Sequence, residues 1–350
     1  MNTKNQLSRL LVFSILFISF ASCKKETIKE SEKTTETTSV NTDNPLPSWN
    51  DGKTKDAIIN YVKDVITEGG ANFIPVSERI ATFDNDGTLW SEQPVYFELF
   101  FALDRIKAMA KDHPEWKDKQ PFKAVLENNM GDLMKQGEKG LGEIMMVTHT
   151  GMTGDEFDKT VKDWMATAQH PIKKKAYNQL VYQPMLELVN YLKANDFKVF
   201  IVSGGGVDFM RAWAEDTYGI PKNQIVGSSG KDQFDYNNGN PVIKKLPALD
   251  MIDDKEGKPV GIYKYIGRKP VFAAGNSDGD LQMLQYAASN KYKNFELYVH
   301  HTDSVREWAY DRKSHIGTFD KGLDFANEKG WTLASMKDDW KVIYPFELKK

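Results

Sequence analysis

The stretch Arg79-Ile80-Ala81-Thr82-Phe83-Asp84-Asn85-Asp86-Gly87-Thr88-Leu89-Trp90 decides the fold. Its short apolar run predicts a buried strand that delivers two carboxylates to its carboxyl end. Open α/β sheets hold their ligands at that edge. Gly87 lets the chain turn at once, so Asp84 and Asp86 are expected to converge on one small polar site. Two carboxylates this close repel each other unless a cation lies between them, which predicts a hard divalent metal, Mg²⁺.

The segment from Phe83 to Leu89 resembles the first motif of the haloacid dehalogenase superfamily, whose phosphatase branch carries Asp-x-Asp-Gly-Thr. The resemblance implies that Asp84 is the nucleophile that takes up the phosphoryl group, and that Asp86 is the general acid/base. It also implies that Asp84 and Asp86 are ligands of the metal. A carboxylate suits covalent phosphoryl capture because it is already ionised at neutral pH. Dehalogenases lack the second Asp, so Asp86 favours phosphate chemistry.

A second buried strand is predicted over residues 197–202, and it runs into Ser203 and Gly204. This resembles the second motif of the same family, which implies that the Ser203 hydroxyl and the Gly204 N–H bind a phosphoryl oxygen. The third motif is a Lys at the start of a helix, whose ammonium offsets negative charge. Lys258 fits this motif best, and Lys255 is the alternative.

A further strand over residues 270–275 ends in Asn276-Ser277-Asp278-Gly279-Asp280. It resembles the family's metal segment Gly-Asp-x-x-x-Asp, with Asn276 where the first Asp is expected and Asp280 as the second. Either Asn276 gives Mg²⁺ a neutral amide oxygen, which should weaken metal binding, or Asp278 substitutes as the ligand. The adjacent His300 and His301 point to opposite faces of a predicted strand, so they do not form a zinc site.

The resemblance implies a Rossmann-like parallel sheet with helices on both faces and an inserted helical cap, an α/β fold. The sequence agrees, because mainly helical patterns separate the first motif from the next strand. The expected helices outside and inside this insertion cover residues 52–68, 95–112, 121–136, 154–168 and 184–195. The expected core domain comprises residues 46–90 and 181–350, and the expected cap comprises residues 91–180.

The amino terminus has the pattern of an export signal. Residues 1–22 combine basic side chains, an apolar run over residues 10–20 that is too short to span a bilayer, and the small residues Ala21-Ser22. Cys23 follows directly, in a pattern that resembles the lipobox of bacterial lipoproteins and implies lipidation. Residues 23–45 lack aromatic side chains and predict a solvated tether. An exported, membrane-anchored protein facing the periplasm or the cell surface is expected.

The expected partner is a small phosphorylated metabolite, with membrane contact only through the lipid anchor. The formal net charge of −3 and the absence of a basic run interleaved with aromatics argue against nucleic acid. Phosphoserine-phosphatase-like members place a Glu near position 93, where this chain has Gln93 beside Glu92. Glu92 with Trp90 and Tyr96 is therefore a candidate specificity group for phosphoserine or, by cation–π contact, phosphocholine. The aromatics equally fit a buried core.

The predicted function is a Mg²⁺-dependent phosphomonoester phosphatase that acts through an aspartyl-phosphate intermediate. Two alternatives remain open. One is a phospho-ligand-binding lipoprotein in which Asn276 marks impaired catalysis. The other is a phosphotransferase with the same covalent chemistry, in which closure of the cap keeps water out.

Overall fold

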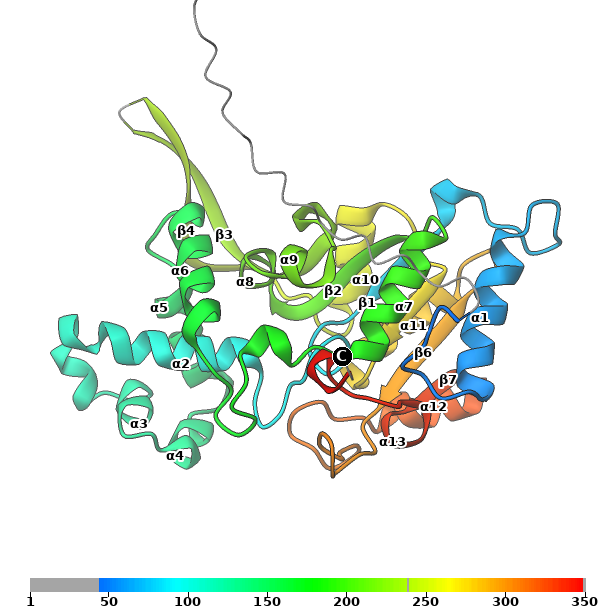
Figure 1. The fold of residues 1–350 in the computed structure, drawn as a ribbon. Coiled ribbons are helices and arrows are strands. Elements are labelled where there is room, and N and C mark those ends of the chain that lie inside the picture. The colour runs from blue at the N-terminus through cyan, green and yellow to red at the C-terminus, as the bar shows by residue number, and fades with distance from the viewer. Residues whose placement is uncertain (1–43, 238, 349–350) are drawn as a thin grey trace, which may run out of the picture. The chain divides into compact units, whose positions relative to one another are not determined.

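The computed structural model of the protein describes residues 44–237 and 239–348 (Figure 1). The predicted signal over residues 1–22, the lipidation of Cys23 and nearly all of the tether lie outside these ranges. Within them, no helix is both long enough and apolar enough to cross a membrane.

Seven strands form one sheet in the order β4-β3-β2-β1-β5-β6-β7. The strands are β1 (Ile80–Phe83), β2 (Lys198–Gly206), β3 (Ile225–Asn237), β4 (Asn240–Met251), β5 (Phe272–Gly275), β6 (Phe295–His300) and β7 (Thr332–Ser335). All neighbours are parallel except β3 and β4. The predicted parallel α/β sheet is confirmed. Its central strands β2, β1 and β5 end side by side, at the edge where parallel sheets bind ligands.

Helices cover both faces of the sheet (Figure 1). Those that pack with the first apolar cluster are α1 (Lys53–Ile66), α7 (Gln183–Ala194), α8 (Val207–Arg211), α9 (Ala214–Tyr218) and α13 (Met336–Asp339). Those that pack with the second are α11 (Leu281–Ala288) and α12 (Lys321–Lys329). The short α10 (Gly257–Gly261) continues into a π-helical turn, Ile262–Ile266, that ends at Gly267.

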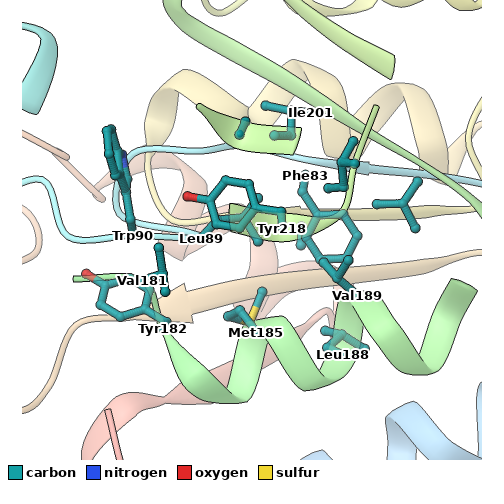
Figure 2. Close-up of a cluster of buried hydrophobic side chains, with 14 of the residues drawn as sticks. Phe83, Leu89, Trp90, Val181, Tyr182, Met185, Leu188, Val189, Ile201 and Tyr218 are labelled. Carbon is teal, nitrogen blue, oxygen red and sulfur yellow. The ribbon is translucent and has the colours of Figure 1, made fainter. Parts of the chain in front are cut away.

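Alternation along the strands explains why both faces are apolar. On β1, Phe83 belongs to the first cluster and Ile80 to the second. Figure 2 shows Met185 and Leu188 of α7 facing the sheet residues Phe83 and Ile201. Because the central strands are covered on both sides, they read as continuous apolar runs, which is why the sequence revealed them.

A group of helices follows β1, within the range predicted for the cap. These are α2 (Phe97–Met109), α3 (Phe122–Leu126), α4 (Met130–Lys135), α5 (Gly137–His149) and α6 (Gly154–Thr167). They have an apolar cluster of their own, which includes Ile106, Phe122 and Ile144. The helix predicted over 121–136 is divided in two at Asn128, whose φ is +54°. Helix α5 was missed because three glycines interrupt its apolar pattern.

The β3–β4 hairpin was also not predicted. Figure 1 shows it extending beyond the other strands. Its second strand touches the α5–α6 connection, where the Gly151 N–H donates to the Lys245 carbonyl (3.0 Å) and the Lys245 N–H donates to the Met152 carbonyl (2.9 Å). The hairpin thus binds the helical segment to the sheet through backbone hydrogen bonds that a local sequence pattern does not reveal.

Leu188→Ala tests the packing of α7 on the sheet. The side chain is fully buried, so its truncation should lower the free energy of unfolding by about 2–5 kcal/mol, measured by urea denaturation. Asn190→Ala on the exposed side of the same helix should change it by no more than about 0.5 kcal/mol. Equal costs for the two substitutions would contradict this packing.

Candidate active site

The loop after β1 requires a glycine at position 87. Gly87 has a φ of +72°, a backbone conformation that residues with a side chain rarely adopt. A Cβ atom there would lie 2.1 Å from Asn276 Nδ2 and 2.5 Å from Glu92 Oε1. The Gly87 N–H donates to the Trp90 carbonyl (2.8 Å), which closes the turn. The first motif can therefore approach the segment after β5 closely.

Lys258 joins the ends of three strands. Its ammonium donates to Asp84 Oδ1 after β1 (2.6 Å), to Asp280 Oδ1 after β5 (2.6 Å) and to the Val202 carbonyl on β2 (3.0 Å). Burial alone would lower the pKa of Lys258, but the charges of Asp280 and Asp84 outweigh burial and raise it. The ammonium therefore stays charged. Lys255, the alternative predicted from the sequence, is exposed, so the structure favours Lys258.

The negative charges near Asp84 and its burial together outweigh the positive charge of Lys258. Burial raises the pKa of Asp84 well above its ordinary value, and the charges of Asp280 and Asp86 add to the rise while Lys258 opposes it. Ionised Asp84, the form that can attack phosphorus, is thus disfavoured without a further cation.

Asp86 is set up to exchange protons near neutral pH. Burial raises the pKa of Asp86 to about 6, the hydrogen bond from Trp90 opposes the rise, and the charge of Glu98 adds to it. Trp90 Nε1 donates to Asp86 Oδ1 over 2.8 Å, which fixes the carboxylate. A carboxyl group with a pKa close to the working pH suits general acid/base catalysis.

Ser203 ends the buried part of β2, and its Oγ accepts from the Gly205 N–H (3.1 Å). A Cβ atom built on Gly205 would lie 3.4 Å from Glu98 Oε2 and 3.5 Å from both Asp86 Oδ2 and Ser203 Oγ. The three side chains therefore converge on one point beside this backbone. Glu98 Oε2 also accepts from the Gly206 N–H (2.7 Å), so α2 contacts the loop after β2.

In the segment after β5, Asn276 and Asp278 make different contacts. The Asp278 carboxylate accepts the N–H groups of Asp320 (2.9 Å) and Gly322 (2.7 Å) at the start of α12, so the prediction of Asp278 as a metal ligand does not match its contacts. Asp280 Oδ2 accepts the Asn276 N–H (2.9 Å). The side chain of Asn276 is buried beside the Gly87 turn.

A cavity of about 380 Å³ opens over these residues. Tyr96 and Glu92, predicted as specificity residues, line it, but Trp90 does not. Trp90 is fully buried and stacks on Trp213 with 4.1 Å between ring centroids, so its position favours the alternative of a buried core, and its indole N–H contacts Asp86. The wall residues that the sequence did not indicate are Glu98, Leu99, Leu141, Met145, Ile252 and Asp254.

The missed residues share a cause. Leu141 and Met145 lie on α5, which was not predicted, and Ile252 follows the unpredicted hairpin. Glu98 stands in the first turn of a predicted helix, where its local sequence pattern does not indicate a place at the site. Its role at the wall depends on how α2 meets the loop after β2.

The chemistry of the cavity fits a divalent cation. Six carboxylates and one ammonium line it, which is a poor environment for a phosphate dianion unless positive charge is added. Among the described residues, no group of three or more His, Cys, Asp or Glu is arranged as a metal site. A cation here would take oxygens from Asp84, Asp86 and Asn276, which is the hard donor set that Mg²⁺ prefers.

The model of the haloacid dehalogenase-like hydrolase family matches residues 81–285, more than half of the chain. No curated protein matches this chain. Similar solved structures include a protein of unknown function from Bordetella pertussis Tohama I, with 14% identity, a TM-score of 0.46, and 74% of this chain and 99% of that one covered. Another, from Anaerococcus prevotii DSM 20548, has 16% identity, a TM-score of 0.49, and 74% and 88% covered.

A phosphoserine phosphohydrolase-like protein from Francisella tularensis subsp. tularensis SCHU S4 has 17% identity, a TM-score of 0.35, and 63% of this chain and 87% of that one covered. At these identities and TM-scores, the likeness says nothing about the reaction that this chain performs.

Asp86→Asn tests the electrostatic cost of the site. Because the pKa of Asp86 rises from 3.8 to about 6 on folding, its contribution to stability is present at low pH and lost as the pH rises through 6. Without metal, the variant should melt at a temperature higher than wild type by roughly 2 °C or more at pH 8, with a smaller gain at pH 5. Calorimetry in EDTA measures both values.

The control is Asp118→Asn, which changes an exposed carboxylate and should show no such dependence on pH. A stabilisation by Asp86→Asn that is equal at pH 5 and pH 8 would contradict a raised pKa at this position.

Proposed function

Because this chain belongs to the haloacid dehalogenase-like hydrolase family, we propose that it is a Mg²⁺-dependent phosphatase of small phosphomonoesters. The prediction of a hydrolase of this family is confirmed by the family match. The observation that carries the phosphatase proposal is the buried contact of Lys258 with Asp84 and Asp280, next to Asp86 with its raised pKa. It unites a nucleophile, a cation and a proton donor at one sheet edge.

The residues act in two steps. In the first, an oxygen of Asp84 bonds to phosphorus, the bond from phosphorus to the alcohol oxygen breaks, and Asp86 gives its proton to that oxygen. In the second, Asp86 takes a proton from water, the water oxygen bonds to phosphorus, and the carboxylate of Asp84 is released. The Ser203 hydroxyl and the Gly204 N–H would hold the phosphoryl oxygens, and the charge of Lys258 would offset theirs. Mg²⁺, when bound, would screen the negative charge of Asp84 from that of the substrate.

The substrate is proposed to carry a cationic leaving group. The lining of the cavity combines the Glu98 carboxylate, whose residue is 8% exposed, with the apolar side chains of Leu99, Leu141 and Met145. An ammonium would pair with Glu98, and a short carbon chain would contact the apolar side chains. Phosphoserine-like and phosphocholine-like esters both fit this description. Their supply from outside the cell would accord with the proposed export and anchoring at Cys23.

Asp84→Asn should abolish phosphate release, by roughly 10³-fold or more, because the amide cannot form the phosphoryl ester. The assay measures inorganic phosphate released by the full chain from a panel of phosphomonoesters, with Mg²⁺ and with EDTA. Asp155→Asn, the same substitution at an exposed position of α6, is the matched control and should leave release unchanged. Folded wild type that releases no phosphate from any ester with Mg²⁺ would overturn the proposal and favour a binding protein.

Glu98→Gln tests the choice of leaving group. The Gln oxygen can still accept from the Gly206 N–H, so the substitution removes mainly the charge. The KM for phosphoserine or phosphocholine should rise about tenfold, which corresponds to about 1.4 kcal/mol. The KM for glycerol phosphate, which lacks a cation, should hardly change. An equal rise for both kinds of ester would contradict recognition of the ammonium.

A further inference from the structure

Glu92 is a buried carboxylate that the proposed two-step reaction does not use. Its side chain lines the cavity, yet the residue is only 2% exposed. Glu92 Oε1 accepts two hydrogen bonds, from Asn276 Nδ2 (2.8 Å) and from the Tyr310 hydroxyl (2.7 Å). Both donors give their hydrogen to the same oxygen, whose two acceptor positions are thereby filled. A buried carboxyl group this close to the site calls for a function.

The contact with Glu92 fixes the orientation of the Asn276 amide. A carboxylate accepts but does not donate, so it binds the amide nitrogen and turns the amide oxygen away. That oxygen, Oδ1, accepts one hydrogen bond from the Thr88 hydroxyl (3.1 Å). An amide oxygen has two acceptor positions, and the described hydrogen bonds use one of them. Without Glu92, little would decide which way the nitrogen and the oxygen of the Asn276 amide point.

Glu92 is itself held by a segment distant in sequence. The ring of His301 stacks on Tyr310 with 4.3 Å between centroids, and the Tyr310 N–H donates to the His301 carbonyl (3.0 Å). His301 Nε2 lies 2.7 Å from the Gly87 carbonyl. The segment after β6 therefore supports both the Gly87 turn and, through Tyr310, the Glu92 carboxylate. This support makes Glu92 part of a preorganised site rather than a mobile acid.

We infer that Glu92 and Asn276 act as one unit of the metal site, in which Asn276 supplies the amide oxygen and Glu92 supplies the negative charge. Glu92 thereby compensates for the neutral ligand at position 276, and it is a positioning residue in the sense that it also orients the amide. The inference rests on the proposed function, because it requires Mg²⁺ to bind beside Asp84. A divalent cation bound beside Asn276 would favour the ionised form of Glu92.

The chain offers a substitution that separates charge from hydrogen bonding. E92Q keeps an oxygen that can accept from Asn276 and Tyr310 but removes the charge. N276D instead sets two carboxylates against each other where the structure has a 2.8 Å hydrogen bond. The double variant E92Q/N276D moves the charge by one residue and restores a donor–acceptor pair, with the Gln amide donating to the new carboxylate.

The experiment titrates Mg²⁺ into the metal-free full chain by calorimetry and measures the melting temperature in EDTA. E92Q should weaken Mg²⁺ binding by about tenfold or more. N276D should lower the metal-free melting temperature through repulsion. The double variant should recover both the affinity and the melting temperature to values near wild type. E296Q, which changes another buried carboxylate at the start of β6, is the control and should bind Mg²⁺ like wild type.

The outcomes separate this inference from the proposed function. Wild type that binds no Mg²⁺ would overturn both the metal dependence and the inference. Wild type that binds Mg²⁺, with E92Q binding equally well, would overturn the inference alone. A double variant that recovers the melting temperature relative to N276D but not the affinity for Mg²⁺ would also overturn it, because relief of the repulsion between two contacting carboxylates restores stability whether or not Glu92 serves the metal site. If E92Q does not fold, the Mg²⁺ affinity of the double variant decides, and a value tenfold or more below that of wild type would overturn the inference.

Discussion

The site depends on one buried ammonium. Lys258 contacts groups at the ends of β1, β2 and β5, and its two carboxylate partners, Asp84 and Asp280, are themselves buried. Removing one member of such a set leaves an unpaired charge in the interior, which costs several kcal/mol. The sheet order β2-β1-β5 and the Gly87 turn are what allow the three groups to meet. This constraint places the buried ammonium at the edge of the sheet where the phosphate of the proposed substrate would bind.

The negative charge around Lys258 destabilises the folded protein, and the proposed reaction depends on the same charged groups. Burial and neighbouring acids raise the pKa values of Asp84 and Asp86, so the protein holds these groups in a state that a cation and substrate would relieve. The helical segment and the hairpin complete the enclosure by adding Glu98 and apolar side chains. Polar groups at the strand ends and partly apolar side chains around them are typical of sites that exclude water from the reacting group.

The sequence predicted the residues at the strand ends better than those that the helical segment and the hairpin add to the cavity, and the reasons are physical. Asp84, Ser203 and Asn276 each follow a buried strand directly, so their meeting at one edge follows from parallel topology. The directions of side chains depend on distant contacts and were not accessible. Asp278 sits within the metal-like segment but caps α12, and Trp90 lies beside the acids but stacks on Trp213. Glu92 was noticed for its charge, whereas its partners Asn276 and Tyr310 became known only from the fold.

The most direct test of the account is a crystal structure of the protein soaked with Mg²⁺ and beryllium fluoride, a group that mimics phosphoryl bound to a carboxylate. We predict that the fluoride group is attached to an oxygen of Asp84, with Lys258 and Ser203 in contact with its fluorine atoms and Mg²⁺ beside Asp84 and Asn276. Density for the group elsewhere in the cavity, or a cation that contacts neither Asp84 nor Asn276, would contradict it.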